Sequence, residues 1–155
     1  LYGTKDTEQN RRKAFQYFNK AALGNHDEAK FQLGKLYIFG EPFIMKNYKK
    51  AYKYFQEAAE SGIVEALFYL GECNMFGLGI EKNEKEAIKY YDEAANQGNI
   101  FANYRLCDVY RSGIGVEKDI DKALIYNART RGHGDFNAEI TYLSLKRERD
   151  LQYRK

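Results

Sequence analysis

The residues of this chain whose types could do chemistry are three serines, two Gly-x-Gly sequences and two histidines. A Ser-x-x-Lys nucleophile needs a lysine three residues after the serine, and here that position holds valine, glycine or arginine. The Gly-x-Gly sequences at 77–79 and 113–115 resemble the start of a phosphate-binding loop, but the third glycine and the Gly-Lys-Ser/Thr ending are missing. Both also follow a predicted helix rather than a strand, so we interpret them as helix–helix turns.

Charge and hydropathy exclude two classes of function. The formal net charge is +3, and lysine and glutamate are interspersed along the chain rather than gathered in a basic stripe. Nucleic acid is therefore not an expected partner. No run of eighteen apolar residues exists, so direct membrane insertion is not expected either. A single proline, Pro42, and 44% apolar residues favour long helices around a continuous core.

Two sequence motifs recur in register along the chain. One runs from an alanine to a glycine and occupies residues 29–40, 66–77 and 102–113. The other begins with a charged residue and an alanine, and these alanines stand at positions 14, 51, 87 and 123. Within a motif the small and apolar residues follow helical spacing, as Ala87, Tyr91 and Ala95 do. The alternating motifs predict an array of amphipathic helix pairs.

Local signals place the helix ends. Asn25 and Asn83 begin sequences that resemble capping boxes, and glycines at positions 40, 62, 77, 98 and 113 suit left-handed C-caps. The predicted helices span residues 7–23, 27–39, 47–60, 64–76, 84–97, 100–112, 120–132 and 136–150.

The combined pattern resembles the Sel1-like repeat family, which is related to tetratricopeptide repeats. The resemblance rests on Ala…Leu-Gly…Tyr…Gly-x-Gly-Val/Ile followed by Lys-Ala…Tyr-Tyr…Ala-Ala…Gly. The loops at 77–80 and 113–116 are its most specific part. The resemblance implies an all-α fold, a right-handed α/α superhelix (solenoid) of helix-turn-helix repeats with about eight helices.

Three positions depart from the family pattern: the first loop lacks its second glycine, Cys107 stands in a glycine position, and Thr130–Arg131 replaces two alanines. We interpret residues 1–155 as a single Sel1-like repeat domain. It comprises a partial first repeat at 7–24, repeats at 27–62, 64–98 and 100–134, and a C-terminal capping helix at 136–150. Because the first residue is Leu1 rather than Met, we expect a fragment of a longer protein.

The histidines and cysteines do not come together in the predicted array. His26 and His133 fall in inter-repeat turns at opposite ends, so they cannot share a metal ion. Cys73 and Cys107 are two residues out of register in equivalent helices, which pack about 8–10 Å apart, whereas a disulfide needs Cα atoms within about 7 Å. We expect two free, buried thiols, with no metal, no cofactor and no enzymatic activity. Free thiols favour the cytoplasm, but the parent protein could be exported or lumenal, so the compartment stays open.

The predicted function is that of a protein-interaction scaffold or adaptor. By analogy with tetratricopeptide repeats, the first helix of each pair lines a concave surface, and its non-repeating positions point inward. These positions mix aromatic, sulfur-containing and charged side chains, which suits a peptide or helix of another protein. The predicted partner-binding residues are Gln32, Lys35, Ile38, Tyr69, Glu72, Met75, Arg105, Asp108 and Arg111.

Two other functions stay open at this point. Some bacterial relatives are described as β-lactamases or penicillin-binding enzymes, but this chain lacks both Ser-x-x-Lys and a disulfide in each repeat. The other alternative is a structural or self-association module, in which the chain forms a homodimer.

Overall fold

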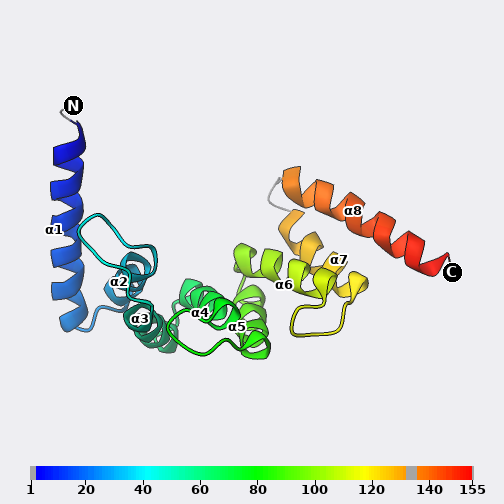
Figure 1. The fold of residues 1–155 in the computed structure, drawn as a ribbon, viewed down its shortest axis with the longest axis horizontal. Coiled ribbons are helices and arrows are strands. Elements are labelled where there is room, and N and C mark those ends of the chain that lie inside the picture. The colour runs from blue at the N-terminus through cyan, green and yellow to red at the C-terminus, as the bar shows by residue number, and fades with distance from the viewer. Residues whose placement is uncertain (1–2, 132–135, 155) are drawn as a thin grey trace. The chain divides into compact units, whose positions relative to one another are not determined.

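The computed structural model describes residues 3–131 and 136–154, and these form eight α-helices (Figure 1). The helices are α1 (Gly3–Leu23), α2 (Asp27–Phe39), α3 (Tyr48–Glu60), α4 (Val64–Phe76), α5 (Glu84–Asn96), α6 (Ile100–Ser112), α7 (Ile120–Arg131) and α8 (Phe136–Tyr153). The predicted all-α fold of paired helices is confirmed. Three helices match their predicted bounds, while α1 begins four residues earlier and α8 ends three residues later than predicted.

The chain divides into two compact units, residues 1–82 and 83–155. The first unit contains α1 to α4 and the second contains α5 to α8. Within each unit, every helix packs on the helix that precedes it in the sequence. Each unit therefore buries its apolar residues between neighbouring helices, as expected of a repeat array.

In the first unit, α2 and α3 approach closely at Gly34. The ring of Phe55 lies directly over this glycine, and a Cβ atom added to Gly34 would stand 2.5 Å from Phe55 Cε1. Phe55 is fully buried, as are Leu33 and Ala51 beside it. Glycine is required here for packing, because any side chain would push the aromatic ring away from the helix.

In the second unit the corresponding position on α6 holds a larger side chain than on α2, and that on α7 holds a smaller one than on α3. Cys107 stands in the place of Gly34, and Asn127 stands in the place of Phe55. Both are buried, and Asn127 Nδ2 donates a hydrogen bond to the Ala138 carbonyl at 3.1 Å. Compared with the first unit, the residue on α6 is larger and the residue on α7 is smaller, and both positions stay buried despite the departure from the family pattern at Cys107.

At the Thr130–Arg131 departure, Thr130 bonds within α7 and Arg131 contacts α8. Thr130 is fully buried, and its hydroxyl donates to the Asn127 carbonyl at 2.7 Å. Arg131 donates to Glu139 of α8 at 2.7 Å, and its guanidinium carbon lies 4.0 Å from the centroid of the Tyr142 ring. These two residues therefore replace the alanine pair of the earlier repeats with polar contacts.

Polar side chains cap the first turn of four helices, each accepting a hydrogen bond from a backbone N–H three residues on. The capping residues are Asn47, Asn83, Asn99 and Asp119, with N···O distances of 2.9–3.0 Å. The cap predicted at Asn83 is confirmed, but the one predicted at Asn25 is wrong. Helix α2 begins after His26, and Asn25 has a φ of 64°. Its side chain instead accepts a hydrogen bond from Lys30.

The Gly-x-Gly sequences are turns between helices, as predicted. Gly79 has a φ of +80°, and a Cβ there would lie 2.5 Å from the Tyr48 carbonyl oxygen. The loop after α4 therefore packs on the start of α3, which only glycine permits at this position. The first loop, without a second glycine, contains an isolated bridge between Glu41 and Ile44 and buries Ile44.

Helix α8, which we expect to be the C-terminal capping helix, exposes several apolar side chains. Ile140, Leu143 and Leu151 are each more than half exposed. Leu143 stands at the position of Gly34 in the repeat. A further helix could not approach α8 there as closely as α3 approaches α2, because the leucine side chain occupies that space.

Candidate interaction surfaces

On α2 and α4 of the first unit, the structure places the predicted partner-binding residues in two different environments. Ile38 and Met75 are each 7% exposed, so they contribute to the core and offer little surface to a partner. Gln32 and Lys35 are partly exposed. The Gln32 amide donates to Glu28 at 2.7 Å, and the Lys35 ammonium lies 5.5 Å from the centroid of the Phe31 ring.

Tyr69, also predicted as a contact residue, lies in an aromatic cluster. Its ring stacks on Phe55 at a centroid distance of 4.8 Å and an interplanar angle of 11°. Phe31 and Phe39 also contact it, at 5.8 and 6.1 Å. Burial, and secondarily the charge of Glu72, raises the pKa of Tyr69 above its ordinary value. Tyr69 thus joins α4 to α2 through Phe31 and Phe39.

In the second unit, α6 carries the remaining predicted residues. Asp108 is exposed and Arg105 is partly exposed. Arg111 is engaged within the chain, because its guanidinium donates to Glu148 and Ser144 of α8 at 2.9 Å. It therefore holds α8 on α6 as well as facing the surface.

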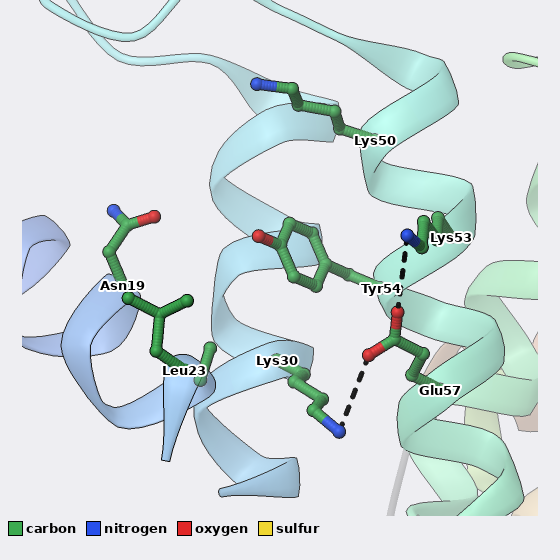
Figure 2. Close-up of a pocket in the computed structure, with 8 residues that line it drawn as sticks. Asn19, Leu23, Lys30, Lys50, Lys53, Tyr54 and Glu57 are labelled. Atoms are coloured by element: carbon green, nitrogen blue, oxygen red, sulfur yellow. Dashed lines mark ion pairs between the residues drawn. The ribbon is translucent and has the colours of Figure 1, made fainter. Parts of the chain in front are cut away.

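The structure shows a second surface feature that the motifs did not predict, a cavity of about 380 Å³ between α1 and α3 (Figure 2). We refer to it as the α1–α3 pocket. It is lined by Asn19, Ala22, Leu23, Lys30, Lys50, Lys53, Tyr54 and Glu57.

Tyr54 lines this pocket and stacks on Tyr37 of α2. The rings of Tyr37 and Tyr54 lie 6.0 Å apart and almost parallel, at 6°. The ammonium of Lys50 stands 5.2 Å from the Tyr37 centroid, within the range of a cation–π contact. Burial, followed by the charges of Tyr37 and Glu57, raises the pKa of Tyr54.

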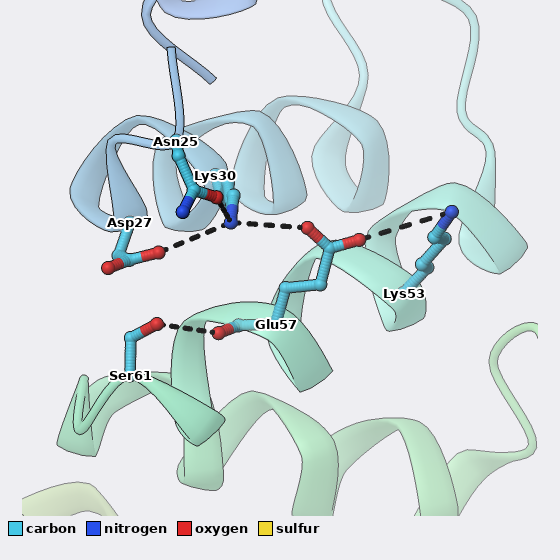
Figure 3. A network of polar contacts seen from close by, with 6 residues as sticks. All are labelled: Asn25, Asp27, Lys30, Lys53, Glu57 and Ser61. Atoms are coloured by element: carbon cyan, nitrogen blue, oxygen red, sulfur yellow. Dashed lines mark hydrogen bonds and ion pairs between the residues drawn. The ribbon is translucent and has the colours of Figure 1, made fainter. Parts of the chain in front are cut away.

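Lys30 lines the pocket and has 9% of its surface exposed. Its ammonium donates to Asn25 at 2.7 Å and to Asp27 at 3.2 Å, and Glu57 of α3 lies 3.4 Å away (Figure 3). A buried ammonium is costly unless it is paired and hydrogen-bonded. Desolvation lowers the pKa of Lys30, but the hydrogen bonds and charges of Asp27 and Glu57 outweigh it and the pKa is raised.

The Asp27 carboxylate accepts a hydrogen bond from Lys30 at 3.2 Å, and the nearby Ser61 hydroxyl donates to the Glu57 carbonyl. The proximity of Ser61, followed by Lys30, lowers the pKa of Asp27 against a smaller opposing effect of burial. Glu57 also stands 4.0 Å from Lys53. Asn25, Asp27 and Glu57 therefore surround the Lys30 ammonium, and the contact with Glu57 joins the start of α2 to the end of α3. Lys50 and Lys53 lie at the edge of the pocket.

The second unit repeats the tyrosine stack and adds a hydrogen bond across from it. Tyr110 and Tyr126 stack at 5.6 Å and 6°, with Lys122 at 5.0 Å from the Tyr110 centroid. Here, however, the Tyr126 hydroxyl donates to Asp92 of α5 at 2.8 Å. Tyr54, its counterpart, makes no hydrogen bond through its hydroxyl to any residue that the structure describes.

One sequence signal could have drawn attention to the pocket. Counting by repeats, the position of Lys30 holds Leu67 in the next repeat and Asn103 in the one after. All three are buried. A charged residue at a position that is otherwise neutral and buried indicates a local polar network.

The two cysteines are free and buried, as predicted. Burial, and secondarily the charge of Glu72, raises the pKa of Cys73 to about 12. Burial followed by Asp108 raises that of Cys107 to about 11, against an opposing effect of Arg111. Both side chains are therefore neutral thiols at physiological pH and unsuited to act as nucleophiles.

No helix in the described part of the chain is both long and apolar enough to cross a bilayer. No three histidine, cysteine, aspartate or glutamate side chains within residues 3–131 and 136–154 converge so that they could hold a metal ion.

The helix pairs, the 36- to 37-residue period and the inter-helix glycine turns define an α-helical repeat protein. The family model "Sel1 repeat" matches residues 1–26, 27–63, 64–99 and 100–126. The chain belongs to the Sel1 repeat family, and its fold class is the helical solenoid of that family.

Solved structures agree with this assignment. A Sel1 repeat protein from Oxalobacter formigenes is 31% identical over 80% of this chain, with a TM-score of 0.71. The antigen c5321 of uropathogenic Escherichia coli, described as displaying an SLR fold, is 25% identical over 84% with a TM-score of 0.78. Helicobacter pylori cysteine rich protein B is 32% identical over 59%, with a TM-score of 0.53.

This chain spans 50% of the Oxalobacter protein, 28% of c5321 and 68% of the Helicobacter protein. No curated protein matches the sequence significantly.

Proposed function

We propose that this chain is a non-enzymatic protein-interaction scaffold that binds a partner peptide or helix on the first helices of its repeats. Sel1 repeats commonly mediate protein–protein interaction, and membership of that family supports the proposal. The partner-binding positions are those predicted above on α2, α4 and α6, of which Ile38 and Met75 contribute least because they are buried.

The observation that carries the proposal is a pair of exposed aromatic residues beside these positions. Phe39 and Phe76 occupy equivalent places at the ends of α2 and α4 and are 60% and 57% exposed. Phe39 contacts Tyr69 at 6.1 Å, so it adjoins the surface formed by Lys35 and Tyr69. Exposed aromatic side chains flanked by charged groups are typical of protein-binding hot spots.

Quantitative affinity capture followed by titration of the purified partner tests this function. The wild-type chain is compared with Lys35→Ala/Phe39→Ala and with Arg105→Ala/Asp108→Ala; Arg111 is kept because it holds α8. Phe39→Ala is expected to weaken binding at least tenfold, about 1.4 kcal/mol, as a truncated hot spot does. Lys89→Ala, whose ammonium is exposed on α5, is the control. If both double variants remain folded and still bind the partner, the proposed binding surface is wrong.

Catalysis and self-association are tested separately. The β-lactamase alternative predicts turnover of nitrocefin that a single substitution abolishes, whereas a scaffold hydrolyses none. The self-association alternative is favoured by the exposed Ile140, Leu143 and Leu151 of α8. A concentration-dependent dimer in sedimentation that Leu143→Glu dissociates would support that alternative over the partner scaffold.

A further inference from the structure

The α1–α3 pocket adjoins a second hollow, and the two share Lys50. The second hollow has a volume of about 380 Å³ and lies where the first loop meets α1. Its apolar lining comes from Phe15, Phe43 and Met45. We refer to the two hollows together as the α1–α3 groove.

Basic side chains dominate this groove. Lys46 and Lys50 line the second hollow, and Lys50 and Lys53 line the rim of the pocket. Among the described residues that line either hollow, Glu57 is the one carboxylate. Glu57 is already engaged with Lys30 at 3.4 Å and lies at 4.0 Å from Lys53.

Lys50 and Lys53 therefore carry charge that the chain does not neutralise. The Lys53 side chain is 77% exposed, so its long contact with Glu57 contributes little. Lys50 has a cation–π contact with Tyr37 and no carboxylate of the described residues within 4.0 Å. An acidic ligand could approach both ammonium groups without displacing an existing close ion pair.

The apolar hollow at the other end is suited to a hydrophobic side chain. Phe43 contacts Phe15 at 6.4 Å, and the Arg12 guanidinium lies 5.0 Å from the Phe43 centroid. Met45 is 89% exposed beside these rings. Methionine adapts its shape readily, which is why it is common at peptide-binding surfaces.

The groove is not an inevitable result of the repeat. At the corresponding place in the second unit, Tyr126 bonds to Asp92, and Arg129 donates to Asn96 at 3.4 Å. The counterpart of Asn96 in the first unit is Leu23, which is 90% exposed. The second unit thus bridges the counterpart of the α1–α3 pocket with its own side chains, which the first unit does not do. The counterpart of the second hollow stays open in the second unit, as a hollow of about 500 Å³ lined by Tyr110 and Lys122.

We propose that the α1–α3 groove binds an extended acidic peptide segment of a partner protein, with an apolar side chain between Phe15, Phe43 and Met45 and carboxylates at Lys50 and Lys53. Charge complementarity selects an acidic segment, and the apolar hollow next to the lysines selects one that also carries a large hydrophobic residue. None of these residues belongs to the surface proposed on the first helices. The proposal rests on the proposed function only in that both require a protein partner.

The probe is a fluorescein-labelled ten-residue peptide with one phenylalanine followed by four glutamates. A length-matched peptide with four glutamines serves as the control. Fluorescence anisotropy is expected to show saturable binding of the glutamate peptide, weakened as salt rises from 0.05 to 0.5 M, because exposed ion pairs are screened. Equal binding of the two peptides would overturn the proposal.

Charge-reversal variants locate the site. Lys50→Glu/Lys53→Glu is expected to weaken glutamate-peptide binding by about tenfold or more, since two attractive contacts become repulsive. Lys89→Glu/Lys122→Glu makes the same charge change in the second unit, at the repeat equivalents of Lys53 in α5 and of Lys50 in α7. It is expected to alter binding less than about twofold. Circular dichroism confirms that both remain helical, and Lys50→Gln/Lys53→Gln gives a milder test if the reversal unfolds the first unit. If both reversal variants lose glutamate-peptide binding equally, the effect comes from the overall charge of the chain, and the proposal is overturned.

Amide chemical-shift mapping gives an independent location. The glutamate peptide is expected to shift the resonances of Phe43, Lys50 and Tyr54, whereas shifts confined to α5–α8 would overturn the proposal. Co-sedimentation with phosphatidylcholine:phosphatidylserine vesicles, lost in Lys50→Glu/Lys53→Glu while the peptide does not bind, would reassign the groove to an anionic lipid surface. Loss of partner capture by Phe39→Ala with glutamate-peptide binding intact would separate this site from the proposed function.

Discussion

The first and second units differ most at the place where the second helices of neighbouring repeats meet. Both units build the same wall there, a lysine over a tyrosine that stacks on a second tyrosine. In the second unit the outer tyrosine bonds across to Asp92, while in the first unit Tyr54 faces the α1–α3 pocket. The wall occurs at corresponding positions of the two units, and the units differ in the side chains across from it.

The largest effect is expected where the two units are most alike. Leu33 and Leu106 occupy equivalent positions and are fully buried. Leu33→Ala and Leu106→Ala should each lower the free energy of unfolding of their own unit by about 2–5 kcal/mol, from lost burial and a residual cavity. Urea denaturation with residue-resolved hydrogen exchange measures this. Leu23→Ala, at 90% exposure, is the control; a loss below about 0.5 kcal/mol at either core leucine would contradict the assigned packing.

A smaller effect should distinguish the units at the glycine position. Gly34→Ala forces a Cβ against the Phe55 ring and is expected to destabilise the first unit by about 1–3 kcal/mol through overpacking. Cys107→Ala keeps the Cβ that the second unit already accommodates, and its cost should be about 1 kcal/mol. Thermal and urea unfolding measure both. Equal tolerance of Gly34→Ala and Cys107→Ala would show that helix spacing is the same in the two units, contrary to the size exchange.

The contact that fills the second unit should be measurable as a single hydrogen bond. Tyr126→Phe removes the hydroxyl that donates to Asp92 and is expected to cost about 0.5–1.5 kcal/mol. Tyr54→Phe removes a hydroxyl without such a partner and should change the free energy of unfolding by less than about 0.5 kcal/mol. If the two substitutions cost the same, the distinction between a filled and an open place fails.

The smallest effect is a pH dependence confined to the first unit. Because its folded-state pKa lies below the ordinary 3.8, Asp27 stabilises the fold above that value, and the contribution is lost as pH falls through the depressed pKa. Thermal unfolding between pH 6 and 2.5 should show a weaker acid dependence in Asp27→Asn than in the wild type. Asp121→Asn in the second unit is the matched control, and an identical change in both variants would refute a specific role of Asp27.

The fold could be predicted from the sequence because the same pattern of packing residues recurs in several repeats. The period, the alanine and leucine positions and the terminal glycines placed α2, α4 and α6 at their observed bounds. The error at Asn25 arose because an asparagine before an acidic residue suits both a cap and a left-handed turn. The turn is favoured here because the Lys30 ammonium donates a hydrogen bond to the Asn25 side chain, which therefore does not cap the helix.

The candidate sites were harder to predict, because a repeat pattern distinguishes repeating from non-repeating positions but not exposed from buried ones. Ile38 and Met75 do not repeat, yet both are buried. The α1–α3 pocket escaped notice for the opposite reason. Its Tyr54 belongs to the repeat, with Tyr90 and Tyr126 at the equivalent positions. The pocket stays open because Asn19 and Leu23 of α1 make no side-chain bridge to α3 like that of Asp92 to Tyr126, and this depends on two helices rather than on one motif.

The stacked tyrosine pairs give each unit its own optical signal. The chain contains 14 tyrosines and no tryptophan, so near-ultraviolet circular dichroism arises mainly from phenolic rings held in fixed orientations. Tyr37–Tyr54 reports on the first unit and Tyr110–Tyr126 on the second. Replacing one tyrosine of a pair at a time would let an experimenter follow each half of the chain separately, without attaching any label.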